Sequence, residues 1–129
     1  MSLFSTKVFD ATKSASKIYR TGFTADQLPD LSDKVAIVTG GNTGMGYEYC
    51  LELARHGAHV IMASRSEDRA ANAIAAIKKS LGDAAKIEFL KLDLMDLKQI
   101  KAAADKFMKM NLPLHILINN AGTIQKLIL

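Results

Sequence analysis

Short apolar runs alternate with longer segments of helical periodicity from Lys34 to Ile118, and this alternation constrains the fold more than any other feature. Short apolar runs bounded by turn residues are typical of buried strands. They occupy residues 35–38, 59–63, 87–90 and 116–118. Strands that alternate with helices at this spacing form right-handed βαβ units around a parallel sheet. The sequence therefore predicts an α/β fold.

Three helices are predicted between the strands, because apolar residues recur there at helical spacing. The first helix is expected to bury Gly46, Cys50, Leu53 and Ala54. The second is expected to bury Ala70, Ile74, Ile77 and Leu81. The third is expected to bury Leu97, Ile100, Ala104, Phe107 and Met108.

The ends of these helices carry signals of their own. Gly57 marks the end of the first helix, and Ser66 is a good N-cap for the second. Asp96, followed three residues later by Gln99, resembles a capping box at the start of the third helix, although Ser or Thr is the usual cap in that motif.

A doubly wound sheet would place the strands in the order 3-2-1-4, which is an incomplete Rossmann fold of about four strands with flanking helices. The first two helices would cover one face of the sheet, and only the third would cover the other. The outer edge of the run 116–118 would then have no strand beside it, and apolar sheet surface would face water. We therefore expect the isolated chain to be marginally folded or to self-associate through this edge.

Composition and charge disfavour several classes of function. The 129 residues carry a net charge of +4, but the basic residues are dispersed and aromatics make up only 6%, which disfavours a nucleic-acid partner. No apolar stretch is long enough for a transmembrane span. The single cysteine, Cys50, excludes an intrachain disulfide and fits a cytoplasmic location. The spacing of His56, His59 and His115 gives no metal site.

Residues 1–30 differ in composition from the rest and are expected to form an N-terminal amphipathic segment and linker. Among lysines and serines, one helical face would carry Phe4, Val8, Ala11, Ala15 and Ile18. Such a segment is compatible with an organelle transit peptide or with a helix on a membrane surface. The alternative is a docking helix or a frayed tail. Residues 31–129 form the second predicted unit.

The turn after the first strand reads Thr39-Gly40-Gly41-Asn42-Thr43-Gly44-Met45-Gly46. Glycines placed in this way let the chain turn tightly and bring backbone N–H groups against a pyrophosphate, which the positive end of the next helix also attracts. No Gly-Lys-Ser/Thr follows, so the turn is not a Walker loop. A methyltransferase-type Rossmann domain is disfavoured, because its glycine loop normally follows an acidic residue rather than Thr39.

The Thr-Gly-x-x-x-Gly-x-Gly spacing resembles that of the short-chain dehydrogenase/reductase family. Two further family motifs occur in the expected places, Asp93-Leu94 after the third strand and Asn119-Asn120-Ala121-Gly122 after the fourth. The resemblance covers residues 28–122. It is greatest to the retinol-dehydrogenase-like branch, because of the residue identities in segments 28–30, 42–46 and 63–65. It implies that Asp93 contacts the adenine ring and that the Asn-Asn-Ala-Gly segment lines the cofactor ribose.

A dinucleotide cofactor follows from this resemblance. The residues assigned to its binding are Gly40, Asn42, Thr43, Gly44, Met45, Gly46, Ser64, Arg65, Asp93, Leu94, Asn120, Ala121 and Gly122. An acidic residue at the end of the second strand would bind the ribose 2′-hydroxyl of NAD and repel a 2′-phosphate. Ser64 and Arg65 stand there instead and can both donate to phosphate, so NADP(H) is predicted over NAD(H). Arg69 either adds charge or is an ordinary surface residue.

The family's catalysis implies a Tyr-x-x-x-Lys pair and an upstream Ser beyond the segment matched here. Tyr19, Tyr47 and Tyr49 are not followed by Lys four positions later, so no catalytic residue is assigned. The full-length form is expected to be an oxidoreductase that acts on small lipophilic alcohols or carbonyls, with residues 31–129 as the NADP(H)-binding half. The alternative is a genuine short form that binds a nucleotide or a protein partner without turnover.

Overall fold

The computed structural model describes residues 22–122. The elements in chain order are a short 3-10 helix η2 (Ala25–Gln27), β1 (Val35–Thr39), α2 (Gly44–Arg55), β2 (His59–Ser64), α3 (Glu67–Leu81), β3 (Ile87–Lys91), α4 (Leu97–Lys109) and β4 (Ile116–Ile118). The strands and helices alternate as the sequence predicts. The expected amphipathic segment over residues 4–18 lies outside the described residues.

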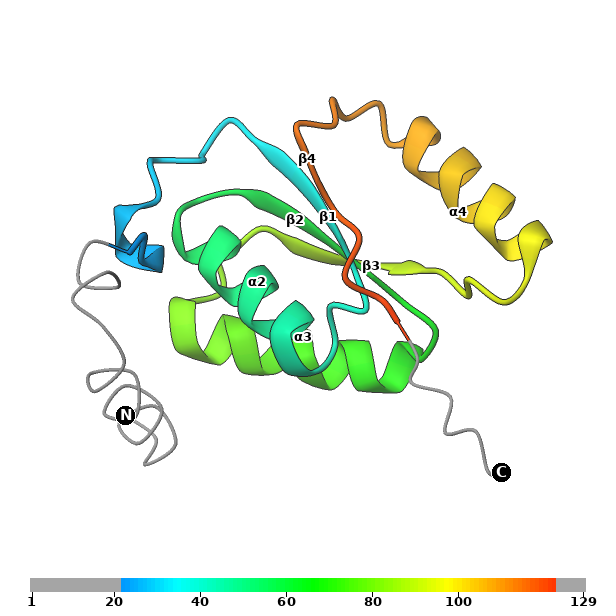
Figure 1. Cartoon of the computed structure of the whole chain (residues 1–129), viewed down its shortest axis with the longest axis horizontal. Helices are drawn as coiled ribbons and strands as arrows, with labels where there is room; N and C mark the ends of the chain where they lie inside the picture. Colours follow the sequence, from blue (N-terminus) through cyan, green and yellow to red (C-terminus); the bar gives the residue numbers. More distant parts are fainter. Residues whose placement is uncertain (1–21, 123–129) are drawn as a thin grey trace.

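The four strands form one parallel sheet in the order β3-β2-β1-β4, which confirms the predicted order (Figure 1). β1 lies between β2 and β4 and pairs with both. Its residue Val38 is opposite Met62 of β2 on one side and Ile118 of β4 on the other. β2 in turn pairs with β3, with Met62 opposite Phe89. The carboxyl ends of all four strands therefore meet at one edge of the sheet.

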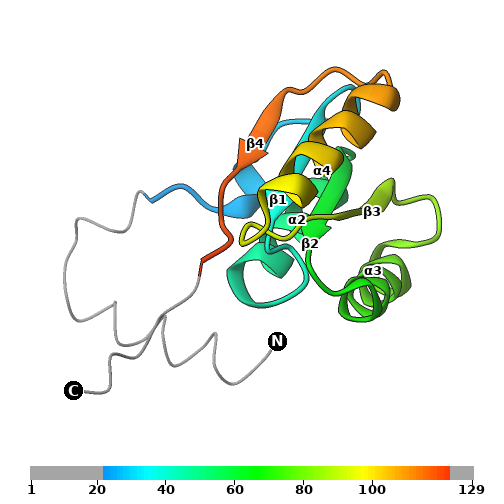
Figure 2. The same cartoon turned by 90° about the vertical axis from the view of Figure 1, so that its right-hand side faces the viewer.

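Helices cover the two faces of the sheet unequally (Figures 1 and 2). α2 and α3 pack on one face, against a core that includes Ala36 and Val38 of β1. α4 packs alone on the other face, against a smaller core that includes Val35 of β1 and Phe107 of the helix. The alternation along β1 follows from the strand period of two, which sends successive side chains to opposite faces.

The start of α3 is capped as expected, because Ser66 Oγ accepts a hydrogen bond from the Arg69 N–H at 3.3 Å. The predicted capping box at the start of α4 is wrong. Asp96 Oδ1 accepts from the Lys98 N–H at 2.9 Å, and the Gln99 side chain donates to the other Asp96 oxygen at 3.4 Å. The Asp96 N–H is already bonded to the carbonyl of Asp93 at 3.2 Å, so Gln99 has no free donor to accept from.

The apolar face predicted for α4 is only partly correct. Phe107 is buried and Ile100 is half-buried, but Leu97 and Met108 are 83% and 72% exposed and Ala104 is exposed as well. Ala103 is buried in their place. A helix that packs alone on a sheet buries one narrow stripe, so the neighbouring apolar stripe is left in solvent.

β4 is one of the two edge strands of the sheet, and β3 is the other. Among residues 22–122 β4 pairs with β1 alone, and Leu117 at its centre is 52% exposed. The expectation of an apolar strand with an unpaired outer edge is therefore confirmed for the described part of the chain. None of the helices that the structure describes combines the length and apolar character needed to cross a membrane.

Candidate functional site

A cavity of about 330 Å³ opens at the carboxyl ends of the strands. Its walls come from four separate segments: the glycine turn after β1, the end of β2 with the start of α3, the turn after β3, and the turn after β4. In an open parallel sheet this is the edge where ligands bind, because the loops that leave the strands converge there.

The glycine turn after β1 has the conformation that its spacing predicts. Gly40 and Gly44 have φ of +66° and +58°, a backbone region that other residues rarely adopt. Gly46 is buried against the Gly40 carbonyl and the Asn120 side chain, and a Cβ at this position would collide with both. The helix therefore starts close to the sheet, as the third glycine implies.

The first turn of α2 is free of side-chain capping, unlike α3 and α4. Its N-cap residue, Thr43, makes no side-chain hydrogen bond to the helix, and the first turn contains no acidic residue. The first N–H groups of a helix have no partner within the helix and carry a partial positive charge. Because Thr43 also lines the cavity, the uncapped helix end is suited to an anion.

Thr39 joins this turn to the end of β4. Its Oγ1 accepts hydrogen bonds from the N–H groups of Asn120 and Ala121, each at 3.0 Å. The Asn120 side chain donates back to the Thr39 carbonyl at 3.1 Å. Asn120 and Ala121, both assigned to the site from sequence, are thus positioned by β1. Sequence analysis missed the role of Thr39, because its partners lie about 80 positions further along the chain.

The end of β2 brings two basic side chains to the cavity. Ser64 is only 5% exposed, and its Oγ has no hydrogen-bond partner among the described residues. Arg65 and Arg69 line the same wall, and no acidic residue stands at the end of β2. Arg69, for which the sequence left an ordinary surface position open, lies in the first turn of α3 and lines the same cavity as Arg65.

The turn after β3 forms the wall next to the end of β2. Asp93 Oδ1 accepts a hydrogen bond from the Met95 N–H at 3.0 Å, which closes a tight local turn. The Leu92 N–H donates to the Ser64 carbonyl at 3.0 Å, so this turn is tied to the end of β2. Met95, which sequence analysis did not single out, also lines the cavity beside Leu94.

Most of the residues assigned from sequence surround the cavity, but three do not. Gly44 and Met45 are exposed in the first turn of α2, and Gly46 is buried behind Gly40. These three residues therefore shape the turn that leads into α2, and they do not line the cavity. Cys50, further along α2, lies in the core beneath the turn, and burial raises the pKa of its thiol to about 12. It therefore adds no charge to the site near neutral pH.

Comparison with known proteins identifies the family. The family model described as short chain dehydrogenase matches residues 34–128. This chain belongs to the short-chain dehydrogenase family. It is 49% identical over 102 residues to a short-chain dehydrogenase/reductase of Armillaria gallica, and 43% identical over 106 residues to human polyprenol dehydrogenase. These matches cover 79% and 81% of this chain, which spans 32% of the length of each relative.

A solved structure of the family shares the fold. It is the NADPH-bound short-chain oxidoreductase from Pseudomonas aeruginosa, which has an atypical catalytic centre. It is 32% identical, with a TM-score of 0.67 over 74% of this chain and 37% of its own. The described residues are thus the dinucleotide-binding Rossmann portion of a short-chain dehydrogenase. The retinol-dehydrogenase-like branch stays a prediction.

The cavity of this short-chain dehydrogenase fits the family's dinucleotide. An uncapped helix end suits a pyrophosphate, and the unpartnered Ser64 hydroxyl suits a polar group of the adenosine ribose. Buried hydroxyl groups are normally hydrogen-bonded, so an orphaned one that lines a cavity indicates that a ligand atom or water completes it.

Proposed function

We propose that this chain provides the NADP(H)-binding portion of an oxidoreductase that interconverts alcohols and carbonyl compounds. The observation that carries the proposal is the end of β2, where the unpartnered Ser64 hydroxyl lies with Arg65 and Arg69 on one wall of the cavity. The family, and a family member with NADPH bound, support a nicotinamide dinucleotide as the ligand.

The preference for a 2′-phosphate follows from charge. A carboxylate at the end of β2 would repel the phosphate, whereas the two guanidinium groups there attract it and can each donate two hydrogen bonds. Ser64 Oγ adds a third donor that needs no rearrangement, because it is not engaged elsewhere among the described residues. Arg69 therefore belongs with Arg65 in this proposal.

The rest of the dinucleotide would follow the edge of the sheet. Its pyrophosphate would lie beside Gly40 and on the N–H groups of Asn42 and Thr43, because the Gly40 N–H already donates to the Ala63 carbonyl at 2.8 Å. The adenine would lie toward Asp93 and Leu94, where a carboxylate and an exposed aliphatic side chain offer an acceptor and an apolar surface. The bound cofactor supplies or accepts the hydride. The residues of this chain bind and orient it.

The substrate of the whole protein is expected to be lipophilic. A relative with 43% identity is named polyprenol dehydrogenase, and a polyprenol is a long-chain lipid alcohol. The exposed outer edge of β4 further supports self-association of the isolated chain. A cytoplasmic location remains part of the proposal on the strength of the single unpaired cysteine.

Fluorescence titration of the purified chain with NADPH and NADH tests the cofactor assignment. We expect NADPH to bind more tightly, and Arg65→Glu to weaken NADPH binding by about 10- to 100-fold with little effect on NADH. Lys79→Glu is the matched control, because it makes the same charge change at the other end of α3. Failure to bind either nucleotide, or tighter binding of NADH by the unchanged chain, would contradict the proposal.

The intact mass of the endogenous polypeptide separates the oxidoreductase from a short nucleotide-binding form. A product that is substantially longer and contains a Tyr-x-x-x-Lys sequence would support the oxidoreductase. A product of 14.0 kDa that binds NADPH without turnover would favour the short form.

A further inference from the structure

The three histidines of the chain lie at the end of the sheet opposite to the cavity. His56 follows α2, His59 begins β2 and His115 immediately precedes β4. No sequence motif gives them a role, and none of them lines the cavity. Their hydrogen-bond partners differ, and this difference decides how each one responds to protonation.

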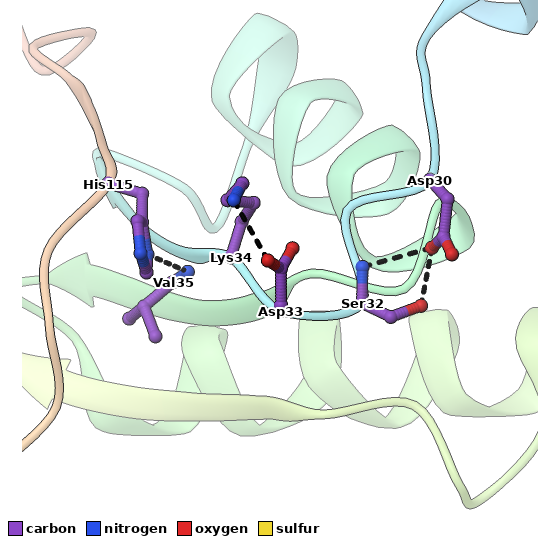
Figure 3. Close-up of polar contacts among 6 residues, drawn as sticks. All are labelled: Asp30, Ser32, Asp33, Lys34, Val35 and His115. Atoms are coloured by element: carbon purple, nitrogen blue, oxygen red, sulfur yellow. Dashed lines mark hydrogen bonds and ion pairs between the residues drawn. The ribbon is translucent and has the colours of Figure 1, made fainter.

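His115 uses its side chain as an acceptor. Its Nδ1 accepts a hydrogen bond from the Val35 N–H at 2.9 Å, and its own backbone N–H donates to the Val35 carbonyl at 3.0 Å. Figure 3 shows the ring beside the first residue of β1. An imidazole nitrogen can accept only when it carries no hydrogen, so the geometry assigns the proton of the neutral ring to Nε2.

The other two histidines face acceptors. His56 Nδ1 lies 2.9 Å from the Glu52 carbonyl oxygen, and His59 Nε2 contacts a carboxylate oxygen of Glu88. Both nitrogens therefore act as donors, and a second proton on either ring leaves these bonds in place. Of the three histidines, only His115 loses a bond when its ring becomes fully protonated.

Asp33 and Lys34 are the charged groups beside His115 on the segment that enters β1 (Figure 3). The Lys34 ammonium donates to Asp33 at 3.0 Å, and this bond, the Lys34 charge and a smaller contribution from His115 hold the pKa of Asp33 below its usual value. The charged groups of the other elements at this end are the pairs His59–Glu88 and Arg55–Glu52, Lys86 before β3, and Asp105, Lys106 and Lys109 near the end of α4. The connection 110–114 carries no charge.

We propose that His115 anchors β4 to β1 in a pH-dependent way. The neutral His115 ring accepts the hydrogen bond from Val35, whereas the protonated ring releases Val35 and turns toward Asp33. β4 has only three residues and, within the described part of the chain, pairs with β1 alone. It therefore depends on the bonds at its two ends. Thr39 holds the carboxyl end, and His115 holds the amino end.

Release at the amino end reaches the cavity through the strand itself. β4 leads directly into Asn120 and Ala121, which form one wall of the cavity. Loss of the His115 bond therefore loosens the support of that wall without changing any residue in it. The proposal is independent of the identity of the ligand.

The tautomer of His115 in the full chain gives the first test and needs no substitution. Two-dimensional ¹H–¹⁵N NMR of the imidazole nitrogens at neutral to mildly alkaline pH distinguishes the two neutral forms. An unprotonated Nδ1 with a protonated Nε2 supports the proposal. A neutral ring with the proton on Nδ1 overturns the proposal, because a protonated Nδ1 has no lone pair with which to accept the Val35 N–H.

Hydrogen exchange at the Val35 N–H gives the second test. Exchange is measured at about pH 7.5 and at about pH 5.5, two values that lie on either side of the reference pKa of imidazole, about 6.5. After correction for intrinsic exchange, we expect protection of Val35 to fall about tenfold at the lower pH. His115→Asn should keep its protection, because the amide oxygen can accept in place of Nδ1 and does not titrate.

His56→Asn is the matched control and should show the same loss as the unchanged chain, because it leaves His115 and its bond to Val35 in place. Equal loss of Val35 protection in the unchanged chain and in His115→Asn would overturn the proposal. Undiminished protection of Val35 in the unchanged chain at the lower pH would overturn it as well.

Discussion

β2 and β4 are the two parallel neighbours of β1, yet they differ sharply in burial. The side chains of β2 from Val60 to Ala63 are fully buried, because strands lie on both sides and helices on both faces. β4 has an equally apolar run, but its central residue Leu117 is 52% exposed. The difference shows that burial of a strand is set by what lies beside it and above it, and not by its own composition.

The two strands are also held to β1 by different means. β2 relies on a five-residue register with β1 and on packing against α2 and α4. β4 shares only three register positions and adds side-chain bonds at both ends, from His115 to Val35 and from Thr39 to Asn120. A short edge strand therefore depends on a few polar contacts, whereas an inner strand depends on buried apolar area.

The largest expected effect is the loss of a buried side chain from β2. Ile61→Ala should lower the free energy of unfolding by about 2–5 kcal/mol, because it removes buried methyl and methylene groups and leaves a cavity. Leu117→Ala in β4 is the matched change and should cost less than about 1 kcal/mol, because half of that side chain is already in water. Denaturant unfolding of both variants measures the difference, and similar costs would contradict the comparison.

The next effect concerns the bonds at the end of β4. Thr39→Val keeps the shape of the side chain but removes the oxygen that accepts from two N–H groups, so it should cost about 1–3 kcal/mol of stability. It should also weaken dinucleotide binding, because Asn120 and Ala121 lose their support. Thr39→Ser retains the hydroxyl and serves as the control. Equal affinities of the two variants in a fluorescence titration would mean that Thr39 does not position this wall.

The free energy of unfolding is expected to depend on alkaline pH through Cys50, which is buried in the core that α2 and α3 form with β1. Burial raises the pKa of the Cys50 thiol from 9.0 to about 12, so the folded state keeps the thiol neutral where the unfolded state ionises. Its contribution to stability is complete below about pH 9 and is lost as the pH rises toward 12. Denaturant unfolding should show a steeper alkaline loss for the unchanged chain than for Cys50→Ala. Parallel pH profiles would argue against this assignment.

The smallest change in stability is expected at the outer edge. Leu117→Lys should alter the free energy of unfolding by no more than about 0.5 kcal/mol, because the site is on the surface. It should nevertheless reduce self-association, because a charge on an edge strand discourages pairing with another edge. Sedimentation velocity over a range of concentrations measures this, and unchanged association would show that another surface is responsible.

Much of the fold could be predicted from periodicity and turn chemistry. The strand order and the cap at Ser66 are local or topological consequences of the sequence and are confirmed. The face that α4 buries was predicted only in part, because Leu97 and Met108 share the apolar spacing of Phe107 but are largely exposed. Spacing identifies apolar stripes on a helix, but packing selects the one that is buried.

The candidate site divides in the same way. The glycine turn and the basic end of β2 could be predicted, because each is a short motif whose chemistry is contained in neighbouring residues. Arg69 could only be suspected and Met95 was missed, because the orientation of a side chain toward a cavity depends on how the helix and the turn are placed.

The sequence by itself determined the parallel α/β order and the segments that form the cavity, since both follow from short-range patterns. Only the tertiary structure decided that Thr39 and His115 fasten the two ends of β4, since their partners lie about 80 residues away. Hydrogen bonds between distant residues depend on the register in which two strands meet. That register is fixed by packing of the whole sheet, and no local pattern contains it.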